Sequence, residues 1–268
     1  MTVGALIFAF NNEQTDYVSL AAWNAKNIQR HLGIPTAIVT DVEPGDPRLV
    51  DVDKIIAATP EAGGMRWFND YQSTSTWYNA SRTDAFELTP WTRTLVLDAD
   101  YVVASNQLGI LLDSDQEFLA HSQAFDVTGT NSFVELNHYG EYRMPMSWAT
   151  VMIFDRNKHT ELIFDSMKMI KNNWQHYKDL YRATSSIYRN DYSLSIALNM
   201  VAGQTLQYPA IPWSLATVTP DHRVSKISED FYRIDYQDLE HRPRWITIQN
   251  HDFHVLGKQD LEKIIETY

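Results

Sequence analysis

Short apolar runs alternate with amphipathic segments along the first part of the chain. Residues 5–10 form a continuous apolar run that predicts a buried strand, and residues 36–41 predict a second one. A helix is predicted between them, with Thr15 or Asp16 as its N-cap and Gly33 at its end. Its apolar face carries Val18, Ala21, Ala22, Ala25, Ile28 and Leu32. This strand–helix–strand unit predicts an α/β fold with a parallel sheet.

The chain continues with less regular segments before its next long apolar run. Residues 54–58 predict a third, shorter strand. Residues 61–69 contain two adjacent glycines and predict a mobile loop. Residues 77–88 predict a helix that carries Arg82 and ends before Pro90.

The second half of the chain shows the same alternation. Strands are predicted at residues 147–155 and 245–250, and a helical turn at residues 108–112. Apolar residues recur in steps of four and three from Ile163 to Tyr181, which predicts one long amphipathic helix. The other predicted helices are residues 192–198, capped by Asn190 and Asp191, and residues 260–267.

Composition limits the possible classes of protein. No low-complexity linker or internal repeat divides the chain, so residues 1–268 are predicted to form one domain. The net charge of −12 disfavours a large non-specific nucleic-acid footprint, although a local basic groove remains possible. Since the chain has no cysteine, disulfides and thiolate metal sites are excluded.

The sequence shows no targeting signal. The N-terminal residues lack a basic region followed by a small-residue cleavage site. No apolar run approaches the roughly 20 residues that a membrane-spanning helix needs. We therefore expect a soluble, cytoplasmic protein.

Two carboxylates interrupt the apolar run at residues 94–103. Asp98 and Asp100 stand at positions i and i+2, which point the same way on a strand. Two carboxylates that converge at a buried strand end repel each other and lose hydration, and a divalent cation relieves both penalties. Mg²⁺ and Mn²⁺ prefer such oxygen ligands. The alternative is a solvated loop or a helix cap.

Other polar residues stand where strands end or helices begin. Asn11 and Asp41 follow the first two strands, where the ligand crevice of an open α/β sheet lies, although Asp41 can equally cap a turn. His251 and His254 come shortly after the last predicted strand. Asp191 can be a simple helix N-cap.

The order of these features resembles the GT-A glycosyltransferases, in particular the retaining, glycogenin-like branch called family 8. The similarity is patchy but spans the chain. Its strongest part is the arginine-bearing helix that ends in proline shortly before the Leu-Asp-x-Asp strand, here residues 81–100. A helix headed by an aspartate and a late His-x-x-Gly motif, here His254 to Gly257, follow in the same order. The resemblance implies a single GT-A domain with a mixed, mostly parallel central sheet flanked by helices. Its nucleotide-binding half is about 1–103, and its acceptor-side half about 104–268.

The resemblance also implies a metal–diphosphate site. Asp98 belongs to the metal site and contacts the ribose or a metal-bound water, while Asp100 and His254 ligate Mn²⁺ or Mg²⁺. His251 is the other candidate for the histidine ligand, because it also stands at the end of the last predicted strand. Lys258 contacts the donor diphosphate, and Arg82 pairs with a donor phosphate or sugar.

The same resemblance implies contacts with the rest of the donor. Asp191 hydrogen-bonds the donor sugar near the reacting carbon, and Phe10, Asn11 and Asp41 hold the base and ribose. Two departures from the family pattern occur: Lys258 follows Gly257 directly rather than three residues later, and Tyr192 replaces the usual glutamine after Asp191.

We therefore predict a metal-dependent glycosyltransferase that transfers a sugar from a nucleotide-sugar, a UDP-sugar, to a hydroxyl acceptor with retention. The acceptor is a glycan, a protein or modified DNA, and the last of these corresponds to a phage-type enzyme acting on a hydroxymethylated base. Small basic patches around Arg242–Arg244 and at Lys168 and Lys171 are the only support for DNA. A nucleotidyltransferase usually has a glycine-rich, basic loop after its first strand, whereas residues 11–16 are acidic and contain no glycine. A non-catalytic sugar- or nucleotide-binding module is the remaining alternative.

Overall fold

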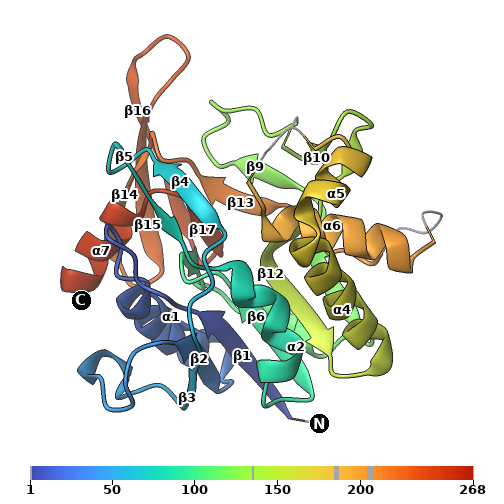
Figure 1. The fold of residues 1–268 in the computed structure, drawn as a ribbon. Coiled ribbons are helices and arrows are strands. Elements are labelled where there is room, and N and C mark those ends of the chain that lie inside the picture. The colour runs from blue at the N-terminus through green and yellow to red at the C-terminus, as the bar shows by residue number, and fades with distance from the viewer. Residues whose placement is uncertain (1, 135, 184–186, 204–207, 268) are drawn as a thin grey trace.

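A computed structural model describes residues 2–134, 136–183, 187–203 and 208–267. Its centre is a six-stranded sheet in the order β3-β2-β1-β6-β12-β8 (Figure 1). The strands are β1 (Val3–Phe8), β2 (Thr36–Thr40), β3 (Lys54–Ala57), β6 (Arg93–Leu97), β8 (Phe118–His121) and β12 (Trp148–Asp155). Neighbours from β3 to β6 run parallel, and β12 runs antiparallel to both of its neighbours. The predicted α/β class with a mixed, mostly parallel central sheet is confirmed.

Helices cover the sheet on both sides (Figure 1). Helix α1 (Tyr17–Leu32) packs against β1 and β2, whereas α6 (Asn190–Val201) packs against β12 and α4 (Lys158–Asn172). Of the two predicted N-caps of α1, Asp16 is the one that accepts a hydrogen bond from the helix, from the backbone N–H of Ser19. Gly33 ends α1 in the left-handed region at φ 64°, where a residue without a Cβ fits best.

Two predictions in the first half are wrong. The predicted loop at residues 61–69 contains β4 (Gly64–Phe68), which pairs antiparallel with β5 (Ser73–Trp77). The predicted helix at residues 77–88 is shorter, because Trp77 belongs to β5 and the helical turns are η2 (Ala80–Asp84) and α2 (Ala85–Leu88). Met65 and Trp67 are exposed on β4, so this strand lacks the buried apolar face that would reveal it in the sequence.

Two predictions in the second half also need correction. The stripe from Ile163 to Tyr181 lies on two helices, α4 and α5 (Trp174–Leu180), because Asn173 leaves helical geometry at φ −121° and ψ 34°. Helix α6 already includes Asn190 and Asp191 in its first turn, with Arg189 as N-cap, so these two residues do not cap it. The side chain of Asp191 is therefore available for contacts outside its own helix.

Smaller sheets complete the fold. A four-stranded sheet has the order β7-β17-β13-β9, and β14, β15 and β16 form an antiparallel sheet. The last two strands of that sheet form a hairpin that projects from the body of the protein (Figure 1). The remaining elements are η1 (Pro47–Leu49), β7 (Tyr101–Val102), α3 (Gln107–Leu112), β9 (Ala124–Asp126), β10 (His138–Tyr139), β11 (Met144–Pro145), β13 (Leu215–Val218), β14 (Arg223–Ser228), β15 (Phe231–Gln237), β16 (Pro243–Gln249), β17 (Phe253–Val255) and α7 (Lys258–Thr267). The predicted strand at residues 245–250 is β16, and the predicted C-terminal helix is α7. Within the described ranges, no helix is both long enough and apolar enough to cross a membrane.

A buried ion pair joins the end of β9 to the loop that follows β13. His222 Nε2 lies 3.4 Å from Asp126 Oδ2, and both side chains are almost completely buried. Burial opposes a charge on either group, but the aspartates around His222 raise its pKa, and hydrogen bonds from His222 and Thr128 help to lower the pKa of Asp126. The stability that His222 supplies is therefore fully present below its ordinary pKa of about 6.5, and it is lost as the pH rises through the raised value.

We expect His222→Gln to remove this alkaline loss of stability. The free energy of unfolding of the wild-type protein should fall as the pH rises from 6 to 9, and the variant should lack the part of that fall due to His222. Urea unfolding at several pH values measures it. His176→Gln, at an exposed position, is the matched control and should keep the wild-type slope. An unchanged slope in His222→Gln would contradict the assignment.

Candidate functional site

Asp98 and Asp100 follow β6 at the carboxyl ends of the parallel strands. The backbone N–H of Asp98 donates to the Thr150 carbonyl at 2.9 Å, which holds this residue against β12. The N–H of Tyr101 donates to the Asp98 carbonyl at 3.1 Å, so the chain turns directly after the strand. The expectation that Asp98 and Asp100 occupy positions i and i+2 of one strand is therefore wrong, because β6 ends at Leu97 and the turn brings the two carboxylates together. Both carboxylates reach the same cavity.

Arg82 and Asn79 hold the side chain of Asp98 in place. The Arg82 guanidinium is almost fully buried and contacts Asp98 Oδ1 through Nη2, while its Nη1 donates to the Ala149 carbonyl at 2.7 Å. Asn79 Nδ2 donates to the same carboxylate oxygen at 3.2 Å. The short helix η2 thus places Arg82, which the resemblance assigns to a donor phosphate or sugar, in an ion pair with Asp98.

Asp100 is held by residues from the end of the chain. β17 pairs antiparallel with β7, which places His254 opposite Tyr101. His254 Nε2 lies 3.3 Å from Asp100 Oδ1, and Lys258 Nζ contacts Oδ2. Burial alone would raise the pKa of Asp100, but the charges of Lys258 and His254 hold it far below its ordinary value. Asp100 is therefore a carboxylate at neutral pH.

These residues form a possible metal site. One ligand atom from each of Asp98, Asp100 and His254 lies within 4.8 Å of the other two. Two carboxylate oxygens and an imidazole nitrogen suit a divalent ion such as Mn²⁺. The other candidate, His251, points elsewhere, because its Nδ1 lies 3.0 Å from Gln107 Nε2. The structure thus brings His254, and not His251, to the two aspartates.

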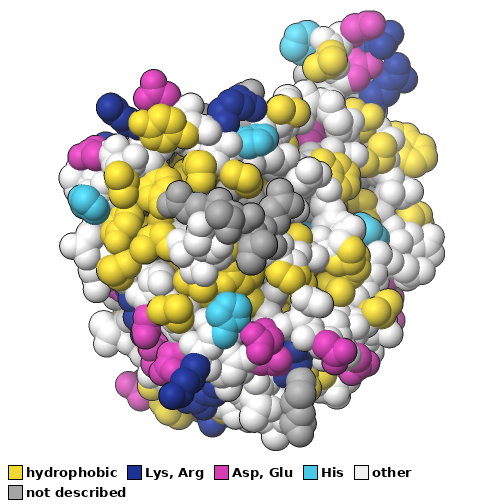
Figure 2. All heavy atoms as spheres, turned by 90° about the vertical axis from the view of Figure 1, so that its right-hand side faces the viewer, with side chains coloured by type: hydrophobic (Ala, Val, Ile, Leu, Met, Phe, Trp, Pro, Cys, Tyr) yellow, Lys and Arg dark blue, Asp and Glu magenta, His cyan; other side chains and the backbone are white. Residues whose placement is uncertain are grey.

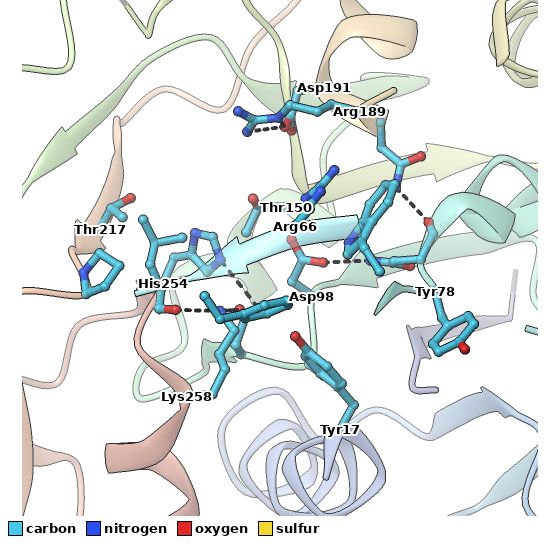
Figure 3. Close-up of a pocket in the computed structure, with 18 of the residues that line it drawn as sticks. Tyr17, Arg66, Tyr78, Asp98, Thr150, Arg189, Asp191, Thr217, His254 and Lys258 are labelled. Atoms are coloured by element: carbon cyan, nitrogen blue, oxygen red, sulfur yellow. Dashed lines mark hydrogen bonds and ion pairs between the residues drawn. The ribbon is translucent and has the colours of Figure 1, made fainter. Parts of the chain in front are cut away.

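The cavity around these groups has a volume of about 340 Å³ and is drawn in Figure 3. Residues from both halves of the chain line it. Among the residues singled out in the sequence, those that line it are Phe10, Arg82, Asp98, Asp100, Asp191, His254 and Lys258. The aromatic residues Trp67, Trp77 and Tyr78 line it as well. Asn11 and Asp41 are not among the lining residues. Asn11 Oδ1 instead accepts a hydrogen bond from the N–H of Val18, at the start of α1, and Asp41 is exposed.

Asp191 and Arg189 form another ion pair in the cavity. Asp191 Oδ1 accepts a hydrogen bond from the N–H of Ala149 at 2.9 Å, and its Oδ2 accepts one from Arg189 Nη2 at 2.8 Å. Burial would raise the pKa of Asp191, but Arg189 and the Ala149 N–H lower it below its ordinary value. Asp191 is therefore ionised at neutral pH and is not a proton donor there.

Sequence reasoning missed two cations of the cavity, Arg66 and Arg189. Arg66 stands on β4, in the segment predicted to be a loop, and nothing in its local pattern marks it. Arg189 is two residues before Asp191, and this spacing could have suggested the ion pair.

No family model matches the sequence, and no curated protein matches it. Similar solved structures include apo glycosyltransferase GlyE of Streptococcus pneumoniae TIGR4, with 15% identity, a TM-score of 0.42, and coverage of 78% of this chain and 45% of GlyE. Galactosyltransferase LgtC, in complex with donor and acceptor sugar analogues, has 14% identity and a TM-score of 0.46 over 73% of this chain and 69% of its own. A putative glucose-1-phosphate thymidylyltransferase from Bacillus anthracis has 11% identity and a TM-score of 0.38, covering 78% of this chain and 98% of its own. The chain thus spans less than half the length of GlyE.

Proposed function

We propose that this chain is a metal-dependent glycosyltransferase that moves a sugar from a UDP-sugar to a hydroxyl acceptor with retention. The observation that carries the proposal is the convergence of Asp98, Asp100 and His254 in one cavity, with Arg82 and Lys258 beside them. Departure of a nucleoside diphosphate needs stabilised negative charge, and this group of residues offers a metal site and two fixed cations for it.

In this proposal each residue acts at one part of the donor. Phe10 and Asp98 contact the base and ribose, and Asp98 shares the metal with Asp100 and His254. Lys258 holds the diphosphate. A bound Mn²⁺ or Mg²⁺ would neutralise charge on that diphosphate. Asn11 and Asp41 do not line the cavity, so they are left out of this assignment.

Asp191 and Arg82 act at the sugar in this proposal. Asp191 is a fixed negative charge, which suits a hydrogen bond to a sugar hydroxyl and stabilisation of positive charge near the reacting carbon. Arg82 orients Asp98 and faces the donor. Residues 1–103 supply most of the nucleotide contacts, and residues 104–268 supply the acceptor side.

The DNA acceptor has less support than a glycan or protein. Arg242 and Arg244 both pair with Asp238, at 2.9 and 3.1 Å. The side chains at this hairpin tip mix both charges (Figure 2, upper right). Lys168 and Lys171 likewise contact carboxylates of neighbouring elements. Each of these four side chains already pairs with a carboxylate. Binding to DNA needs cationic side chains that are free to contact phosphates.

Calorimetric titration with UDP, GDP and ADP, each with Mn²⁺ and with a chelator, tests the proposal. We expect UDP to bind at least about tenfold more tightly with Mn²⁺ than without it, because the metal joins the aspartates to the diphosphate. Release of UDP from UDP-sugars would then identify the donor. Metal-independent binding, or no binding of any nucleotide, would contradict the proposed site. Binding without UDP release from any donor, even with acceptors added, would favour a non-catalytic module.

A further inference from the structure

Arg66 is a cation of the cavity without a carboxylate of its own. Its guanidinium carbon lies 3.6 Å from the centroid of the Trp77 ring, across the β4–β5 hairpin. Its Nη2 donates to the Tyr188 carbonyl at 3.2 Å. Within the part of the chain that the structure describes, no carboxylate forms an ion pair with it. Trp77 and Tyr188 therefore hold the side chain in place without pairing its charge.

The other cations of the cavity differ from Arg66 in this respect. Each of them faces its own aspartate: Arg82 with Asp98, Arg189 with Asp191, and Lys258 with Asp100. Arg66 lies near Arg189, so two like charges share one wall. Burial and the charge of Arg189 lower the pKa of Arg66 to about 10, and it remains a cation at neutral pH. A bound anion would relieve this repulsion.

Arg66 does not lie at the end of the cavity where Lys258 lies. The charged groups that act on Arg66 are Arg189, Asp191, Tyr17 and Asp98. In Figure 3, Arg66 lies between Asp98 and the Arg189–Asp191 pair, while Lys258 and His254 lie to the other side. The guanidinium of Arg66 therefore lies in the part of the cavity next to Asp191.

Building on the proposed glycosyltransferase function, we propose that Arg66 and Arg189 bind a carboxylate or phosphate carried by the transferred sugar or by its acceptor. The substrate class is thus a uronic acid or a phosphorylated sugar. The guanidinium fork suits two parallel hydrogen bonds to such a group. Asp191, which pairs with Arg189, can still accept hydrogen bonds from sugar hydroxyls.

Two pairs of probes distinguish the donor from the acceptor. UDP-glucuronate is compared with UDP-glucose on the Mn²⁺-loaded protein, and glucose 6-phosphate with glucose on the protein loaded with Mn²⁺ and UDP. We expect the charged member to bind about ten- to a hundredfold more tightly in one of the two pairs, as one charge-assisted contact allows. A preference in the first pair assigns the charge to the donor sugar, and a preference in the second assigns it to the acceptor.

Variants of Arg66 show whether this residue causes the preference. Arg66→Gln should remove it while leaving the affinity for UDP within about twofold, and Arg66→Lys should restore part of it. Arg233→Gln is the control, because Arg233 also lies over a tryptophan ring, 5.3 Å from the centroid of Trp245, but stands on β15 outside the cavity, where it pairs with Asp235. The retained affinity for UDP also shows that each variant is folded.

Three results would overturn the inference. Equal binding of charged and neutral probes in both pairs, with UDP still bound, rejects the anionic substrate and leaves the proposed function intact. An equal loss of affinity for UDP and for the charged probe in Arg66→Gln assigns Arg66 to the diphosphate instead. Absence of UDP binding to the wild-type protein rejects the proposed function together with this inference.

Discussion

Replacing Asp100 by asparagine is expected to lower the affinity for Mn²⁺ by at least about a hundredfold and to abolish metal-dependent UDP binding. Loss of a group that only supports a metal ligand already costs about ten- to a hundredfold, so loss of a ligand should cost more. His254→Ala should have a similar effect, since its Nε2 lies beside Asp100 Oδ1. Titration of Mn²⁺, followed by electron paramagnetic resonance of the free ion, measures both.

The control for this experiment is His251→Ala. His251 lies between β16 and β17, three residues before His254; it is half-buried and contacts Gln107 rather than the aspartates. Its removal should leave the Mn²⁺ affinity within about twofold. Loss of Mn²⁺ binding in His251→Ala, or retention of binding in His254→Ala, would contradict the ligand set.

Asp100→Asn has a structural cost that must be separated from its effect on the metal. Lys258 is buried beside Asp100, and its Nζ also donates to the carbonyls of Val255 and Leu256. Without the aspartate, a buried ammonium keeps no counter-charge, which destabilises a fold by about 3–5 kcal/mol. His254→Ala leaves no such charge, so a parallel loss of Mn²⁺ binding in both variants points to the metal rather than to unfolding.

The central sheet and the two aspartates were predictable because their signals are local. The apolar runs of β1, β2 and β6 are continuous, and the end of the β6 run marks where Asp98 and Asp100 stand. The two aspartates lie in the turn after β6, so their convergence comes from that turn and not from the alternation of a strand. His254 and Lys258 are different. Their distance along the chain from the aspartates gives no physical signal, and only the resemblance to a family suggested them.

The sugar end of the cavity could not be predicted from local pattern. Arg66 contacts the Tyr188 carbonyl across 122 positions of the chain, and its strand exposes Met65 and Trp67 instead of burying them. The local sequence pattern around Asp191 predicted only a helix N-cap. Its place in the first turn of α6 directs its side chain to Ala149 on β12. Both contacts depend on packing between distant segments.

The second large effect is expected for Asp191→Asn. This change keeps the size of the side chain and removes its negative charge next to the proposed sugar position. We expect the rate of UDP release from the selected UDP-sugar to fall by about 10²–10³, the range for loss of one preorganised group that stabilises transition-state charge. The affinity for UDP itself should stay within about twofold, because His254 and Lys258 lie elsewhere in the cavity (Figure 3).

A matched control separates lost chemistry from a lost ion pair. Asp155 pairs with the buried Arg93 at 2.7 Å, as Asp191 pairs with Arg189 at 2.8 Å, but it does not line the cavity. Asp155→Asn should therefore lower the free energy of unfolding without changing the rate of UDP release. If both variants slowed release equally, or if Asp191→Asn weakened UDP binding as much as it slowed release, Asp191 would not act at the sugar. A selective fall in rate is the result that the geometry of the Asp191–Arg189 pair requires, since a carboxylate fixed by two partners can stabilise charge without moving.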